Sequence, residues 1–253
     1  MIKTTYNIKD TINIAKQYYC GKDKYFLKPK FEEQFPKLKE LKNKKEIELF
    51  FNKEYKKLES KINIKKKLKQ TKEFFNKNQD FLEKNLFKLM KYPIFDVEVR
   101  LTLLPIAPYY KNRIYLPLLN QDCLDYFYLH ETSHLIWHER EPKIFKKLNI
   151  NIKKHFKELH DIKEIFASVI INQEIFKDVL KKRLGFLNKS KNFNFDKDYG
   201  NYYENYFIKE KGKSVNIVDY FMEFYKKNIK KGFLYVQEEA IKKILKFSIN
   251  ISK

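Results

Sequence analysis

Hydrophobic residues recur at helical spacing along most of the first third of the chain. We expect a short helix over 11–20 with Asp10 as its cap, followed by a loop-like segment over 22–36. Residues 37–91 then read as helix nearly throughout, with apolar positions at Leu38, Leu41, Ile47, Leu49, Phe50, Tyr55, Leu58, Phe74, Phe75, Phe81, Leu82, Leu86, Phe87 and Leu89. A break near 59–63 divides this stretch into two antiparallel helices.

The pattern turns from helical spacing to alternation after Pro93. Apolar and charged residues alternate from Phe95 to Arg100, and this period of two predicts a half-buried strand within 94–104. A second short strand is expected over 113–118. We expect the two strands to pair in a small antiparallel sheet that precedes the next helix.

Helical spacing returns in the rest of the chain. We expect a helix over 121–139 that ends before Pro142, and a long helix over 154–182. Asparagine, lysine and aromatic residues fill 187–213, which reads as a long loop. The last two helices are expected over 214–230 and 235–247, and Gly232 is expected to stop the first of them.

These elements predict an α+β fold that is mostly helical. The N-terminal helices form one region, 1–91, and the strands and later helices form a second, 92–253, unless the two make one continuous domain. With 253 residues, of which 43% are hydrophobic and 17% aromatic, the chain is long enough to bury a sizeable core.

The formal net charge of +22 suggests, by itself, a polyanion such as nucleic acid as a partner. Lysine supplies nearly all of this charge, since the arginines are only Arg100, Arg113, Arg140 and Arg183. Nucleic-acid sites favour arginine, whereas a chain rich in Lys, Asn and Ile is typical of an A+T-rich genome. The segment 61–72, with six lysines and no acidic residue, reads as a solvated helix face. Nucleic acid is therefore not the favoured partner.

The two cysteines, Cys20 and Cys123, form no C-x-x-C motif, so neither a disulfide scaffold nor a cysteine zinc site is expected. The N-terminus lacks the apolar core of a signal peptide, and no apolar run reaches the length of a membrane span. We expect a soluble, cytoplasmic protein without a membrane partner.

The strongest chemical signal lies in the helix expected over 121–139. His130, Glu131 and His134 form an H-E-x-x-H motif. Residues four apart share a helix face, so His130 and His134 can offer two imidazole nitrogens to one metal ion. Glu131 is then within reach of a water molecule on that metal and can take its proton. Zinc binds in this way in hydrolases, with three protein ligands and an open position.

A third protein ligand is needed, because zinc sites of this kind use three. The longer motif with a histidine six residues after the second is excluded, since Arg140 stands there and Trp137 replaces its glycine. Glu164, on the next long helix, is a carboxylate candidate thirty residues after His134. The alternates on the same two helices are His138 and His160, followed by the weaker candidates Asp161 and Glu174.

Two segments carry a family resemblance: H-E-T-S-H at 130–134 and E-I-F-A-S at 164–168. They resemble the glutamate-zincin (gluzincin) class of zinc metallopeptidases, which carry H-E-x-x-H on one helix and E-x-x-x-D or E-x-x-A-D on the next. The resemblance implies that His130, His134 and Glu164 bind Zn²⁺ and that Glu131 is the general base. It also implies a zincin-like core, in which a small sheet precedes the motif helix and an edge strand borders the cleft for a peptide or protein substrate.

The second motif departs from that class at one position. Ala167 matches its small residue, but Ser168 stands where the class often carries an aspartate that orients a ligand histidine. The resemblance spans about 40 residues, from His130 to Ser168. Near the metal, His160 is also a candidate donor to the transition state.

We therefore expect a zinc-dependent metallopeptidase. Two alternatives remain. The first is a basic helical protein that binds nucleic acid or another polyanion, in which the motif is structural or accidental. The second is a zincin-fold interaction protein that binds zinc without hydrolysing peptides. Metal content and the salt dependence of nucleic-acid binding separate these readings.

Overall fold

The computed structural model describes residues 2–21, 24–93, 95–118, 124–176, 206–210, 212–247 and 249–251. Contacts within the chain define two compact units. Unit 1 comprises Met1–Asp80 and Asp96–Phe127, and unit 2 comprises Phe81–Phe95 and Tyr128–Lys253. The division into 1–91 and 92–253 stays a prediction from the sequence. The described residues are mostly helical with a small mixed sheet, so the expected α+β class is confirmed.

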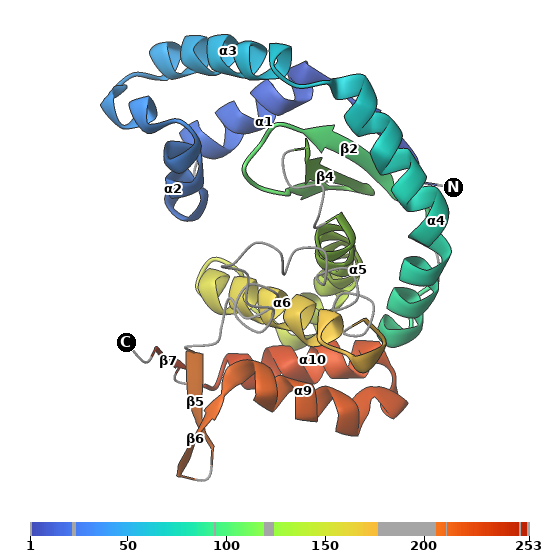
Figure 1. The fold of residues 1–253 in the computed structure, drawn as a ribbon. Helices are drawn as coiled ribbons and strands as arrows, with labels where there is room; N and C mark the ends of the chain where they lie inside the picture. The colour runs from blue at the N-terminus through green and yellow to red at the C-terminus, as the bar shows by residue number, and fades with distance from the viewer. Residues whose placement is uncertain are drawn as a thin grey trace. The chain divides into compact units, whose positions relative to one another are not determined.

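Unit 1 holds the N-terminal helices and a four-stranded sheet (Figure 1). Its elements are β1 (Lys3–Tyr6), α1 (Ile8–Cys20), α2 (Lys24–Gln34), the 3₁₀ helix η1 (Pro36–Glu40), α3 (Lys44–Ser60), the start of α4 (Ile64–Met90), β2 (Glu98–Thr102), β3 (Tyr109–Tyr110), β4 (Arg113–Pro117) and the first residues of α5 (Leu124–Leu148). The break predicted near 59–63 is confirmed, because α3 ends at Ser60 and α4 begins at Ile64.

The cap predicted for the first helix is wrong. Asn7 caps α1 instead, and its side chain accepts a hydrogen bond from the backbone N–H of Lys9. Asp10 lies inside the helix and pairs with Arg100 of β2 at 2.6 Å. The sequence could not distinguish the two caps, because the distant partner of Asp10 decides between them.

The segment 22–36, expected to be a loop, contains the helix α2 with Pro29 inside it. Proline removes one backbone hydrogen bond from a helix interior. Packing offsets that loss: Phe31 is fully buried, and its ring lies 6.2 Å from Tyr19 of α1 and 5.9 Å from Phe51 of α3, measured between centroids. Tertiary burial of an aromatic side chain therefore overrides the local signal.

The expected antiparallel pairing of the two strands is wrong. The sheet has the order β1-β2-β4-β3, and β2 pairs with β4 in parallel, with Leu101 opposite Leu116. The chain between β2 and β4 forms β3, which pairs with β4 in an antiparallel hairpin. The chain therefore reverses direction twice between β2 and β4, so these two strands run parallel. Strand β1 adds a second parallel pair at the other side of β2. Neither β1 nor β3 shows the alternation that revealed β2.

Among its described residues, unit 2 holds the end of α4 and most of α5, followed by further helices and a small antiparallel sheet (Figure 1). These later elements are α6 (Phe156–Ile171), β5 (Tyr206–Glu210), β6 (Lys213–Asn216), α9 (Ile217–Asn228), the 3₁₀ helix η3 (Ile229–Lys231), α10 (Phe233–Ile244) and β7 (Ile249–Ile251). Gly232 adopts φ of 96° between η3 and α10, which confirms the predicted stop.

Two predictions for unit 2 are corrected by these bounds. The helix expected over 154–182 begins at Phe156 and ends at Ile171, with Asn172 as its C-cap. Residues 174–176 are helical again, and 177–182 lie outside the described residues. The loop expected over 187–213 contains β5 and the start of β6, while 187–205 lie outside the described residues. Ser214 therefore belongs to a strand, and Asn216 caps α9.

Helix α5 continues past Pro142, although the sequence predicted an end before it. Proline lacks the N–H group that would bond the carbonyl of His138, and its ring crowds that carbonyl. The neighbouring carbonyl of Trp137 gains a donor from another helix, since Nε2 of the buried Gln237 of α10 lies 2.8 Å from it. A long-range hydrogen bond thus supports the helix at the turn that the proline weakens.

Aromatic rings from several helices form the core of unit 2. Phe166 of α6 lies among them, with centroid distances of 5.0 Å to Trp137, 5.6 Å to Phe221 and 6.2 Å to Phe233. Each of these four side chains is at most 1% exposed. Helices α9 and α10 both pack against α6 (Figure 1). This core fixes α6, the helix that carries Glu164, against α5.

Arg140 ties α5 to the end of α4 within unit 2. Its guanidinium donates to the backbone carbonyl of Lys91 at 2.9 Å and lies over the ring of Tyr92. The carbonyl is one that the end of α4 leaves without a helical partner.

In the described part of the chain, no helix is long and apolar enough to cross a membrane.

Replacing Phe166 with alanine should lower the free energy of unfolding by about 3–5 kcal/mol, because a fully packed ring leaves a cavity. Phe156→Ala is the matched control on the same helix: this ring is 52% exposed, and its loss should change stability by less than about 0.5 kcal/mol. Urea unfolding followed by the fluorescence of Trp137 measures both. Equal losses in the two variants would contradict the assignment of the core.

Candidate metal centre

The H-E-x-x-H motif lies in the first half of α5, where the helix is buried on nearly all sides. Tyr128, Leu129 and Ile136 are fully buried, and they fix the rotation of the helix about its axis. The same packing leaves His134 only 2% exposed and Glu131 only 7% exposed. Both polar side chains are therefore held away from bulk water.

Glu164 of α6 meets the two histidines of α5. Its Oε2 atom lies 3.1 Å from Nε2 of His130 and 3.1 Å from Nε2 of His134, and the two Nε2 atoms are 2.9 Å apart. In a tetrahedral zinc site with bonds of 2.0–2.1 Å, ligand atoms lie about 3.3 Å from one another. The three donor atoms therefore stand nearly at the separations that one ion requires, and together they form a candidate metal site.

This group contains two imidazole nitrogens and one carboxylate oxygen. The structure thus brings together the three residues that the sequence singled out as ligands, from two helices and across thirty positions of the chain. Comparisons with models of protein families, with curated proteins and with solved structures give no match.

The protonation states of the group suit a metal ion. Burial lowers the pKa of His134 to about 3, so its imidazole is neutral. Burial alone would raise the pKa of Glu164, but its contacts with the two histidines hold that pKa well below its usual range. Burial alone would lower the pKa of His130, but the hydrogen bond to Glu164 outweighs this effect, and the pKa is raised. A metal must displace the proton of His130, so we expect affinity to increase with pH.

Glu131 stands beside the three donors without belonging to them. It follows His130 in the helix, and burial raises the pKa of its carboxyl group to about 8. Such a group accepts a proton near neutral pH, which an exposed carboxylate does poorly. The role of general base assigned to it from the sequence stays a prediction.

Lys163 is a residue of the site that the sequence analysis missed. Its Nζ atom lies 3.3 Å from Oε1 of Glu164, and its side chain is only 10% exposed. The ammonium group therefore engages the carboxylate oxygen that does not face the two histidines. The sequence does indicate that Lys163 is buried, because it precedes Phe166 by three positions and so lies on the apolar face of the helix.

The alternates for the third ligand lie outside the group of three. His138 is 43% exposed, and its Nδ1 atom is bonded to Glu141. His160 is 37% exposed, and its Nε2 atom lies 3.7 Å from Oε1 of Glu164. The structure therefore places His160 next to the carboxylate, on the side away from the two motif histidines.

The remaining candidates have other contacts. Asp161 accepts a hydrogen bond from Lys157 at 2.8 Å, and Glu174 is exposed beyond the end of α6. Ser168 donates from Oγ to the backbone carbonyl of Glu164 at 3.3 Å. In this structure that hydroxyl supports the helix turn that carries Glu164.

The first prediction for this site concerns metal content. His134→Ala and Glu164→Ala should each lose the bound metal, because two remaining donors hold zinc poorly. His138→Ala and His160→Ala are the matched histidine controls and should retain about one ion per chain. Mass spectrometry of protein purified without a histidine tag gives the ratio. Metal retained in Glu164→Ala but lost in His160→Ala would assign the third position to His160.

A second prediction follows from the burial of Glu131. Its pKa is raised from 4.5 to about 8, so the folded protein binds this proton more tightly than the unfolded chain does. The resulting stabilisation is complete below pH 4.5 and is lost as the pH rises to about 8. In metal-free protein, Glu131→Gln should therefore gain stability over the wild type between pH 5 and pH 8.

The measurement is thermal unfolding after treatment with a chelator. Each kcal/mol gained corresponds to about 2–4 °C for a chain of this size. Glu139→Gln, an exposed position on the same helix, is the control and should show no such trend. A constant difference between Glu131→Gln and the wild type across this range would show that the carboxyl group is not buried.

Proposed function

We propose that this chain is a zinc-dependent metallopeptidase. The observation that carries the proposal is the convergence of His130, His134 and Glu164, with donor atoms 2.9–3.1 Å apart, beside the buried Glu131. Hydrolytic zinc sites use three such protein donors and leave a fourth position open for water or substrate. The carboxyl group needed to move a proton is the residue next to a ligand.

Zinc is the ion that this donor set favours. Imidazole nitrogen suits zinc, whereas calcium and magnesium prefer oxygen ligands throughout. Two histidines and a carboxylate also bind Fe²⁺ in oxygenases, which keep several open positions. The buried Glu131, a proton acceptor beside the donors, supports hydrolysis rather than redox chemistry. Mass spectrometry of the purified protein would distinguish the two ions.

The residues have distinct tasks in the proposed reaction. A bound zinc ion would supply Lewis acidity, lowering the pKa of water toward about 7 and polarising the scissile carbonyl. Glu131 takes the proton of the attacking water and delivers it to the leaving amine. Glu164 holds one oxygen toward the histidines while Lys163 engages the other. His160, on the far side of Glu164, remains a candidate donor to the substrate.

The order of elements supports a zincin-like core of the glutamate-zincin class. A small sheet precedes the motif helix α5, and the next helix, α6, carries the third ligand. The class resemblance rests on the motif of α5 and on Glu164 with Ala167 in α6. A peptide or protein is the substrate that the class implies, and a cytoplasmic location remains a prediction.

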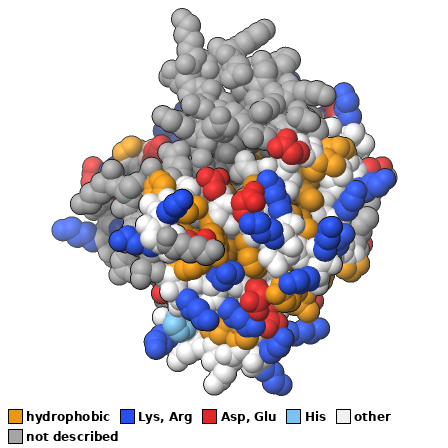
Figure 2. Space-filling view, turned by 90° about the horizontal axis from the view of Figure 1, so that it is seen from below, with side chains coloured by type: hydrophobic (Ala, Val, Ile, Leu, Met, Phe, Trp, Pro, Cys, Tyr) orange, Lys and Arg blue, Asp and Glu red, His pale blue; other side chains and the backbone are white. Residues whose placement is uncertain are grey.

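The net charge of +22 favours a second candidate, a protein that binds a polyanion. Figure 2 shows one face of the molecule, seen from below. Lysine and arginine side chains are spread over the described part of this face, with aspartate and glutamate between them. A dispersed charge of this kind supports solubility more than a dedicated nucleic-acid site. The third candidate, a zinc-binding protein without hydrolysis, differs from the peptidase only in activity.

Glu131→Gln tests the proposal. The variant should keep its zinc, since Glu131 is not among the three donors, and should lose peptide hydrolysis by at least about 100-fold, because general acid–base catalysis is removed. A library of unlabelled peptides, incubated with wild type or variant and analysed by mass spectrometry, reports any cleaved bond. Hydrolysis that survives in Glu131→Gln would refute the assigned base. Zinc without hydrolysis in the wild type would favour the non-catalytic alternative.

A further inference from the structure

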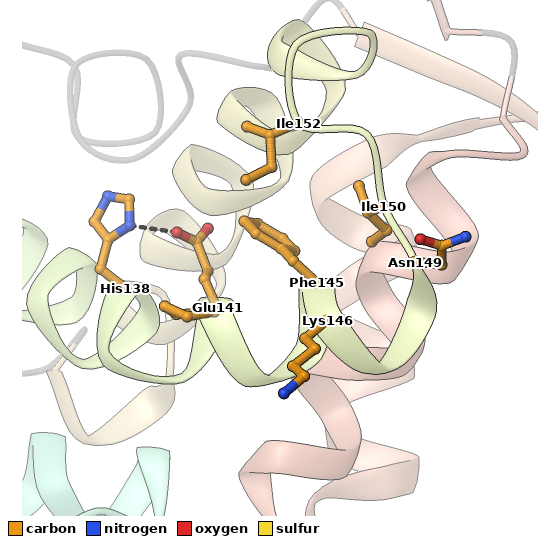
Figure 3. A pocket seen from close by; sticks show the side chains of 8 residues that line it. His138, Glu141, Phe145, Lys146, Asn149, Ile150 and Ile152 are labelled. Atoms are coloured by element: carbon orange, nitrogen blue, oxygen red, sulfur yellow. Dashed lines mark hydrogen bonds and ion pairs between the residues drawn. The ribbon is translucent and has the colours of Figure 1, made fainter.

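A pocket of about 520 Å³ lies along α5 on the C-terminal side of the metal-binding pair (Figure 3). Its apolar walls are Phe145 of α5 and Ile150 and Ile152 of the segment that leads to α6. Figure 3 shows Phe145 and Ile152 extending toward the same space, with His138 and Glu141 at its other end. The volume falls within the range of ligand sites and is large enough for an amino-acid side chain.

The pocket continues the helix face that carries the metal pair. His138 follows His134 by one turn, and Glu141 and Phe145 follow at spacings of three and four, so all four share one face. At a rise of 1.5 Å per residue, the pocket residues on this face, from His138 to Phe145, lie about 6 Å to about 16 Å along the axis from His134. An extended peptide advances about 3.3 Å per residue. A peptide that ran along α5 would therefore reach these residues roughly two to five positions from the scissile bond.

The end of the pocket nearer the metal is built from fixed polar groups. Glu141, only 7% exposed, accepts a hydrogen bond from Trp137 Nε1 at 2.8 Å, and its other oxygen is bonded to Nδ1 of His138. A carboxylate held in this way fixes the imidazole ring, whose second nitrogen points away from Glu141 (Figure 3). The bonded imidazole and carboxylate thus make this end of the pocket polar.

Apolar surface is also exposed on the α6 side of the site. Ile152, in the pocket wall, is 49% exposed, and Phe156, at the start of α6, is 52% exposed. The ring of Phe156 lies 6.4 Å from that of His160, which in turn neighbours Glu164. Exposed apolar side chains therefore accompany the metal-binding face of α6 as well as that of α5.

We propose that this pocket is a subsite for a large aliphatic or aromatic side chain of a peptide, two to five residues from the bond cleaved at the metal. The inference rests on the proposed peptidase function and adds the class of substrate to it. Phe145, Ile150 and Ile152 take up the side chain, while His138 and Glu141 form the polar end of the pocket.

Ile152→Asp tests the subsite, because this exposed position tolerates the change and places a charge in the pocket wall. Ile175→Asp is the matched control, since Ile175 is 39% exposed in the same unit and does not line the pocket. Ile152→Ser provides a milder second variant. All three should keep the zinc content and melting temperature of the wild type.

The first readout is cleavage of synthetic peptides that carry Phe, Leu or Ser at each of five positions on either side of the bond. Wild type should prefer Phe or Leu at one of the positions two to five by about 10–100-fold in kcat/KM, the equivalent of burying one large apolar side chain. Ile152→Asp should abolish this preference and leave the Ser peptide unaffected. No such preference, or a preference that survives in Ile152→Asp, would overturn the subsite.

The second readout is independent of catalysis. The same peptides, labelled with fluorescein, are titrated with the Glu131→Gln protein and with its Ile152→Asp derivative, and anisotropy gives Kd. Tighter binding of the Phe peptide than of the Ser peptide, weakened about 10-fold or more by Ile152→Asp, supports the subsite. Equal affinities would refute it. If such binding occurs while the wild type cleaves nothing, the peptidase proposal fails and the pocket remains a peptide-binding site.

Discussion

The contact between Glu164 and the two motif histidines is the interaction on which the site depends. It joins α5 to α6 through the buried His134 and the partly buried His130 and Glu164, and polar groups of this kind are costly to bury alone. The aromatic core around Phe166 and Trp137 supplies the apolar burial that holds these helices together. Because the core fixes the helices, the polar groups meet at fixed distances. Contacts with the two histidines lower the pKa of Glu164, whereas burial lowers the pKa of His134.

Polar groups around this contact each have a partner that orients them. Lys163 and His160 lie beside the second oxygen of Glu164, and Ser168 bonds its backbone carbonyl. Farther along α5, Glu141 joins Trp137 to His138 in the same manner. Each of these bonds limits the orientation of a side chain on α5 or α6.

The sequence predicted the parts that depend on local pattern. The spacing of His130 and His134, the break before α4 and the stop at Gly232 each follow from a few neighbouring residues, and the structure agrees with them. The choice of Glu164 came from a resemblance, and the structure places that residue against the histidines. Contacts between distant residues could not be read in the same way: burial of Phe31 keeps Pro29 inside a helix, and the parallel pairing of β2 depends on β1 and β3. Lys163 was missed because lysine side chains ordinarily face solvent, although this one lies three positions before Phe166 on the apolar face of the helix.

The parallel pair of β1 and β2 has a consequence for how the chain acquires its fold. Lys3 lies opposite Glu98, so the two strands are separated by about 95 residues of chain. Contacts between such distant segments form slowly, because the intervening chain must be ordered before the pairing stabilises it. During synthesis, the first strand leaves the ribosome long before its partner exists. Unit 1 therefore completes its sheet late, and Lys3–Tyr6 remain unpaired with Glu98–Leu101 during that interval, a segment open to association with other chains.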